Sequence, residues 1–183
     1  MCVDSVMNYS KLVVYTLSRI GLMILISAFS AFCGVVVFPS LITLLPSSLM
    51  EFKNFMASTE TQSFIGFLIV AAFMLMIFYN DGKKHTAYET WSIVNISIVY
   101  ICMFLAYFIF SVFRDSLAAE GKGMIFYKIF YFPCFWIYNE NSMNFMASVM
   151  IESAAVLILC FIVYVFSYKL YIKKHPDIYK SVH

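Results

Sequence analysis

The chain has 183 residues, of which 63% are hydrophobic and 12% are charged, and its mean hydropathy is +0.87. A soluble domain of this length carries far more polar surface, so the composition excludes an ordinary water-soluble fold. The net charge of +2 gives no basis for binding nucleic acid. The five cysteines lie far apart with no CxxC pair, which argues against a disulfide framework.

Long runs without charge indicate the fold class. Residues 20–50, 61–80 and 90–113 contain no Asp, Glu, Lys or Arg, and between Glu140 and Lys169 the only charge is Glu152. Each run provides the roughly 20 apolar residues that a helix needs to cross a bilayer. We therefore expect an all-α integral membrane protein, a bundle of four transmembrane helices arranged as two hairpins.

The predicted spans form one membrane domain over residues 1–183. Pro39 and Pro46 end the first span, and residues 51–56 form a short piece at the membrane interface. A compact polar turn is predicted over 80–85, because Asp81-Gly82 is a strong breaker. A basic tail covers 169–183, and the spans in chain order are 17–38, 64–79, 91–113 and 145–168.

The segment 124–138 joins the third and fourth predicted spans. It is apolar, but it is short, it is interrupted by Lys128, and Pro133 kinks it. Its many aromatic residues are typical of the belt at the level of the lipid headgroups. We expect a re-entrant or interfacial segment; the alternative is a fifth span.

Basic residues predict the orientation. With four spans, the N-terminus, the 80–90 turn and the tail share one side, which carries eight of the twelve Lys and Arg residues. Since basic residues stay on the cytoplasmic side, both termini are expected in the cytoplasm of a cell that carries this protein in its plasma membrane.

Glu152 is the one acidic residue within a predicted span. A charged carboxylate there costs about 2.5–3.5 kcal/mol on insertion scales unless it is protonated, paired or hydrated. Two interpretations remain open. In the first, Glu152 pairs with Arg114 at the outer end of the third span or reaches the interface; in the second, it binds a proton, a cation or a ligand in a polar cavity.

Other candidate positions lie in the first and third spans. Asn95 is an amide one turn into the third span, suited to a hydrogen bond between helices or, less commonly, to a ligand contact. The first span holds two pairs of small residues four positions apart, Ser27 with Ala31 and Ser30 with Gly34, a pattern that lets helices pack closely. Their partner is another helix of the chain or a second copy.

No pattern predicts catalysis. The three histidines form no HxxxH or HExxH motif, and neither a nucleophile elbow nor a phosphate-binding loop is present. We expect no catalytic residues, no metal site and no cofactor. The lysines that flank the spans are suited to anionic lipid headgroups.

Two stretches carry a family resemblance. Phe78-Tyr-Asn-Asp-Gly-Lys-Lys-His85 and the tail from Tyr168 to Lys174 resemble small, uncharacterised four-helix membrane proteins of Gram-positive bacteria such as clostridia. In that family the second hairpin turns on a Tyr-Asn-Asp/Ser-Gly element and the tail is rich in lysine and tyrosine. The resemblance implies a bacterial plasma-membrane protein and lends no site residue.

Two hypotheses for function follow. The first is a non-enzymatic membrane protein that acts through the lipid bilayer, another membrane protein or a second copy, as accessory, immunity or stress factors do. The alternative is a small transporter or substrate-binding membrane subunit in which Glu152 lines a polar cavity.

Overall fold

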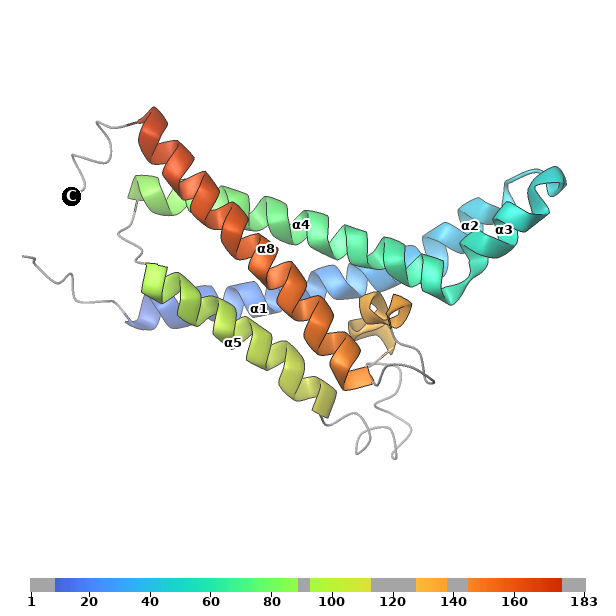
Figure 1. Cartoon of the computed structure of the whole chain (residues 1–183), viewed down its shortest axis with the longest axis horizontal. Helices are drawn as coiled ribbons and strands as arrows, with labels where there is room; N and C mark the ends of the chain where they lie inside the picture. Colours follow the sequence, from blue (N-terminus) through green and yellow to red (C-terminus); the bar gives the residue numbers. More distant parts are fainter. Residues whose placement is uncertain (1–8, 89–92, 113–127, 138–144, 176–183) are drawn as a thin grey trace, which may run out of the picture.

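The structure, a computed structural model, describes residues 9–88, 93–112, 128–137 and 145–175. In that part of the chain every regular element is helical. The elements are α1 (Tyr9–Phe32), the π turn η1 (Cys33–Val37), α2 (Phe38–Thr43), the 3₁₀ turn η2 (Ser47–Leu49), α3 (Met50–Ala57), α4 (Thr59–Tyr88), α5 (Ile93–Val112), the 3₁₀ turn η3 (Phe132–Trp136) and α8 (Phe145–Lys174) (Figure 1).

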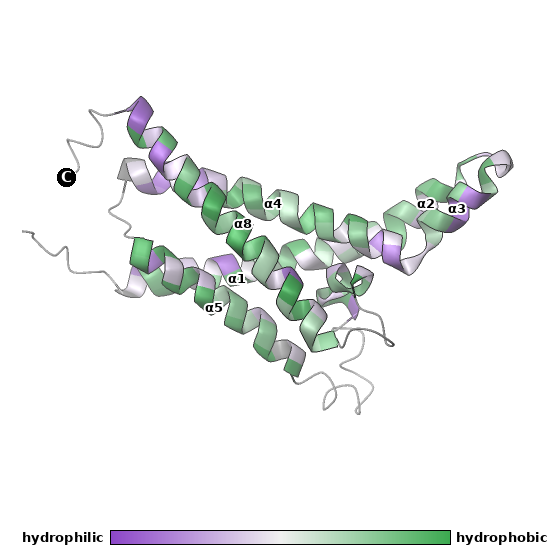
Figure 2. Ribbon diagram, in the orientation of Figure 1, coloured by the Kyte–Doolittle hydropathy of each residue, from purple (hydrophilic) through white to green (hydrophobic). Residues whose placement is uncertain are grey.

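Three of the described helices are long and apolar enough to cross a membrane. They cover Ser10–Thr43, Thr59–Thr86 and Phe145–Lys174, and a shorter apolar helix covers Ile93–Ile109. At the rise of an α-helix, the 28 residues of the shortest candidate reach about 42 Å, more than the roughly 30 Å of a hydrocarbon core. Figure 2 shows hydrophobic residues along most of each long helix. Several of these large apolar side chains are exposed, among them Leu25, Ile101 and Ile162.

The first helix continues past the predicted break at Pro39. Within η1 the N–H of Phe38 donates to the carbonyl of Cys33, five residues earlier. The wider π turn precedes Pro39 and places it in the first turn of α2. Proline is tolerated there, because the N–H groups of a first turn make no hydrogen bond within the helix. The helical path from α1 therefore ends only at Thr43.

The prediction of a turn over residues 80–85 is wrong, because α4 runs without interruption from Thr59 to Tyr88. Gly82 lies where α4 meets α8, and a Cβ there would come within 2.6 Å of the Tyr164 carbonyl oxygen. Asp81 pairs with Arg19 of α1. Asp81-Gly82 has a low helix propensity of its own, and the contacts of these two residues with α1 and α8 stabilise the helix through them.

α4 is the central helix of the bundle. It packs against α1, α8 and η3, while α5 packs against α8 and α1. Figure 1 shows α2 and α3 projecting together beyond one end of the bundle, and their contacts are with each other, with η1 and η2, and with α4.

The segment between α5 and α8 is folded against the bundle. Of the predicted 124–138, residues 128–137 lie within the described part, and they form a helical turn followed by η3. Phe130, Tyr131, Phe132 and Cys134 are each at most 4% exposed. This stretch packs against α1, α4 and α8.

Candidate functional site

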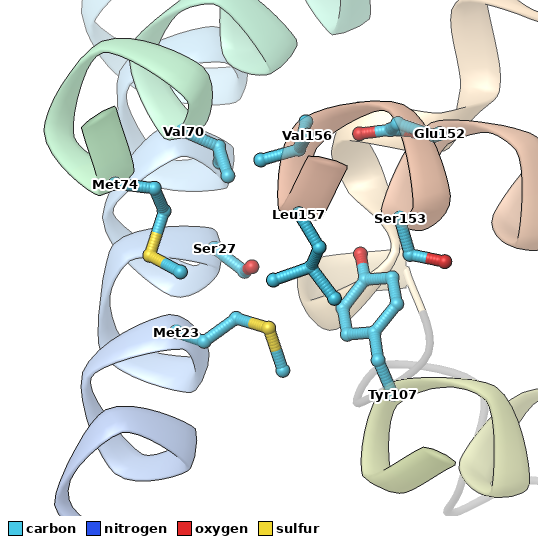
Figure 3. Close-up of a pocket in the computed structure, with 9 residues that line it drawn as sticks. All are labelled: Met23, Ser27, Val70, Met74, Tyr107, Glu152, Ser153, Val156 and Leu157. Atoms are coloured by element: carbon cyan, nitrogen blue, oxygen red, sulfur yellow. The ribbon is translucent and has the colours of Figure 1, made fainter. Parts of the chain in front are cut away.

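Glu152 lies in the interior of the bundle, on the second turn of α8. Its side chain is 4% exposed. It borders a cavity of about 20 Å³, room for about one water molecule. Figure 3 shows the lining side chains, which come from α1, α4, α5 and α8 and are Met23, Ser27, Val70, Met74, Tyr107, Glu152, Ser153, Val156 and Leu157.

Two oxygen atoms at this cavity have no hydrogen-bond partner among the described residues. They are Oε2 of Glu152 and the hydroxyl oxygen of Ser27. Ser153, by contrast, donates to the carbonyl of Val149 at 2.6 Å, which is the usual arrangement of a serine in an apolar helix. A buried polar group without a partner costs about 1–3 kcal/mol, so a fold that keeps two of them together needs an explanation.

The segment 128–137 closes one side of the Glu152 site. The Tyr107 hydroxyl of α5 lies 3.7 Å from the sulfur of Cys134, and the Cys134 thiol is a hydrogen-bond partner of the Glu152 carboxyl group. Burial and the neighbouring Glu152 raise the pKa of the Cys134 thiol well above its ordinary value, so the sulfur keeps its proton and donates. Tyr131 donates to the Tyr107 carbonyl at 2.6 Å and fixes this arrangement.

Small residues position this closing segment. A Cβ on Gly34 would collide with the ring of Phe132, and a Cβ on Gly66 would lie 3.0 Å from the same ring. Ser63 of α4 donates to the Phe132 carbonyl at 2.6 Å and accepts from the Trp136 N–H at 2.9 Å. The two glycines and Ser63 therefore form the seat for η3 between α1 and α4.

A second polar cluster lies toward the other end of the same helices. Arg19 of α1 binds Asp81 of α4 through two nitrogens, with Nε to Oδ2 and Nη2 to Oδ1 both at 2.7 Å. The side chains are 16% and 5% exposed. Tyr15 also donates to Oδ2 of Asp81 at 2.7 Å, and the guanidinium lies 4.6 Å from the centre of its ring. The ion pair is bidentate and charge-assisted, the strongest class of protein hydrogen bond.

His85 extends this cluster to α8. Its Nδ1 lies 2.9 Å from the Tyr164 hydroxyl, and its ring is 5.1 Å from that of Tyr15. Ser167 of α8 donates to the carbonyl of Tyr79 at 2.6 Å, across the contact made by Gly82. The cluster thereby joins α1, α4 and α8 with polar bonds.

The two polar sites are separated along the bundle. Val70 lines the Glu152 cavity and Asp81 lies 11 residues further along α4, about 16 Å by the helical rise. Between them the packing is apolar, with Met74 and Phe78 each at most 2% exposed. The Tyr100 hydroxyl of α5, also buried, has no partner among the described residues.

The predicted positions are distributed as follows. Ser27, Ser30, Ala31 and Gly34 are all buried, and their neighbours include η3 and α4. Asn95 is half-buried on α5, away from the residues that line the Glu152 cavity. Arg114 lies outside the described residues, so its pairing with Glu152 stays a prediction.

Sequence reasoning missed the Arg19 cluster. The available signal was the spacing: Tyr15 and Arg19 are four residues apart, as are Asp81 and His85, so each pair shares one helix face. Treating Asp81-Gly82 as a turn concealed the second pair.

Comparisons with known protein families, curated proteins and solved structures give no match to this chain.

Proposed function

We propose that this chain is a non-enzymatic, multi-pass membrane protein in which the Glu152 carboxyl group takes up and releases a proton inside a bundle of four spans. The observation that carries the proposal is the buried Oε2 of Glu152, which has no partner among the described residues and faces a cavity shared with the equally unpartnered Ser27 hydroxyl. Ionisable groups within membrane bundles commonly serve in proton and ion pathways.

Size and ligand number support a proton as the species bound. A volume of about 20 Å³ is far below the roughly 300 Å³ at which pockets for organic ligands begin. Among the described residues the site offers two oxygens without a hydrogen-bond partner, those of Glu152 and Ser27, whereas magnesium takes six ligands and calcium six to eight. A proton with at most one water meets the demands of both oxygens.

The surroundings of Glu152 suggest the side from which the proton arrives. On the side of η3, the Cys134 thiol and the Tyr107 hydroxyl form a polar path to the carboxyl group. On the side of the Arg19 cluster, apolar Met74 and Leu157 separate Glu152 from the next polar residues. We propose that the proton reaches Glu152 from the η3 side through Tyr107 and Cys134, both of which are buried in this structure.

Infrared titration of the purified protein in lipid tests this proposal. Wild-type protein should show a protonated-carboxyl band that changes with pH and is lost in Glu152→Gln. Glu60→Gln removes an exposed carboxylate in the first turn of α4 and should keep the band. A band of equal intensity in both variants would show that Glu152 is not the titrating group. Proton flux into vesicles, followed with an internal pH-sensitive dye, then separates a transport pathway from a static binding site.

The four-span topology is part of the same proposal. α5 has 20 residues, about 30 Å in length, which matches one hydrocarbon thickness. It packs against α8 and α1 and carries exposed apolar residues such as Val94, Ile101 and Leu105. The eight-to-four distribution of basic residues supports cytoplasmic termini, with 128–137 as a re-entrant segment on the outer side.

Reporter fusions test this topology. Fusions after Lys84 and after His183 should both report the cytoplasm, and a fusion at Glu120 should report the outside. A C-terminus found outside would contradict the four-span arrangement.

A second candidate function is favoured by the projecting pair α2 and α3. Leu44, Met50 and Phe55 are 80%, 61% and 64% exposed there, beyond the end of the bundle (Figure 1). Exposed apolar surface of this kind is suited to a membrane-protein partner or a second copy. Cross-linking in the native membrane should capture that partner in wild type, and Phe55→Ser should lose it; Val14→Ser on α1 is the matched exposed control.

A further inference from the structure

An apolar groove of about 660 Å³ runs along the outer face of the bundle, away from the Glu152 cavity. One wall is formed by the end of α1 and by η1, from Ala28 to Val36, and the other by the segment 128–135. The first residue of α4, Thr59, also lines it. Val36 lies eight positions after Ala28 along this helical path, so the groove is about 12 Å long by the helical rise.

The lining has one charge. Of the described residues that form the groove, Lys128 alone is ionisable, and it is exposed. The rest are apolar apart from Thr59. An occupant that satisfies both features has a long apolar part and a negative group at one end.

We propose that this groove binds one acyl chain of an anionic phospholipid, whose phosphate lies at Lys128. A bilayer surrounds the apolar helices with phospholipids at high concentration. A basic residue near the membrane surface contributes about 1 kcal/mol toward an anionic lipid. That amount corresponds to a preference of about five-fold over a zwitterionic lipid with the same chains.

The groove is also connected to the seat of η3. Phe132 lines the groove, and the same ring packs against the positions of Gly34 and Gly66. An acyl chain in the groove would lie against η3 at Phe132, whose side chain is only 4% exposed, and would hold η3 in its seat. Binding of the lipid does not depend on whether Glu152 carries a proton, so the two proposals fail separately.

Native mass spectrometry of the purified protein tests the proposal. The protein is titrated with phosphatidylglycerol and, separately, with phosphatidylcholine of identical acyl chains. Wild type should retain the anionic lipid about five-fold better. Lys128→Gln should remove the preference for phosphatidylglycerol while the total amount of retained lipid stays unchanged. Lys53→Gln, on α3 outside the groove, should keep that preference.

A second variant tests the apolar wall. Ala28→Phe fills the groove from α1 and should lower retention of both lipids, whereas Val14→Phe, at a position 66% exposed on the same helix, should not. Unchanged anionic preference in Lys128→Gln overturns the assignment of the headgroup, and unchanged retention in Ala28→Phe overturns the assignment of the groove. A dimer that Ala28→Phe dissociates would also overturn it, since the groove would then be an interface between copies. If Ala28→Phe does not fold, the comparison of Lys128→Gln with Lys53→Gln, both surface changes, still decides.

Discussion

Replacing Gly82 with alanine tests the close contact between α4 and α8. A Cβ at this position would lie 2.6 Å from the carbonyl oxygen of Tyr164 and 3.0 Å from the Cβ of Ser167. Both are parts of the α8 backbone or fixed directly to it, so no side-chain rotation can relieve the overlap. The two helices must move apart, and the 2.6 Å hydrogen bond from Ser167 to Tyr79 must lengthen.

The expected magnitude is the sum of three opposing effects. Overpacking of a close contact costs about 1–3 kcal/mol, and weakening the Ser167 hydrogen bond costs roughly 0.6 kcal/mol more. The higher helix propensity of alanine returns up to about 1 kcal/mol. With the full propensity gain counted, we therefore expect Gly82→Ala to lower the free energy of unfolding by about 0.6–2.6 kcal/mol.

The assay is equilibrium unfolding in mixed micelles of mild detergent and dodecyl sulfate, followed by circular dichroism. Gly21→Ala is the matched control, because a Cβ at Gly21 meets nothing within 4 Å. That variant should keep or raise stability by up to about 1 kcal/mol. If Gly82→Ala is as stable as Gly21→Ala, the close approach of α4 and α8 is refuted.

Three further predictions use the same unfolding assay. Arg19→Met should cost about 3–5 kcal/mol because it leaves Asp81 buried without its cation, and the double variant Arg19→Met with Asp81→Leu should cost less than the sum of the single changes; additive losses would contradict the ion pair. Because the pKa of the Cys134 thiol is raised in the folded state, the unfolded chain loses this proton first, so stability should fall as pH rises above about 8.5; Cys134→Ala should show a smaller fall, and equal slopes would refute the burial. Gly34→Leu should destabilise the protein because the Phe132 ring occupies the space, by about 1–3 kcal/mol, and an unchanged transition would show that η3 is not seated there.

Local hydrophobicity predicted the helices themselves. Runs of about 20 apolar residues can satisfy their backbone in an apolar medium only as helices, and α5 at Ile93–Val112 lies within the predicted span 91–113. The all-helical class and the long apolar helices follow from the same local property. Ser27 and Gly34, named from their size and spacing as positions for helix packing, are buried in the structure.

Helix ends were harder to predict, because they depend on distant contacts. Asp81-Gly82 favours a turn when its own propensities are considered alone. In the structure Asp81 binds Arg19, 62 residues away, and Gly82 fits against α8. Pro39 also failed to end its helix, because a π turn before it absorbs the change in geometry.

Glu152 shows how much of this protein the sequence by itself determined. The sequence identified a carboxyl group within an apolar run, and it indicated that this group must be protonated, paired or hydrated. Only the tertiary structure placed it beside Ser27 of α1, Tyr107 of α5 and Cys134 of the closing segment. The hydropathy of a helix is a sum over consecutive residues, so the apolar helices can be predicted directly from the sequence. The partner of a buried polar group depends on which helix faces pack together. Small residues such as Gly34 and Gly66 allow that close packing, and the residue that they contact, Phe132, is far away in the sequence.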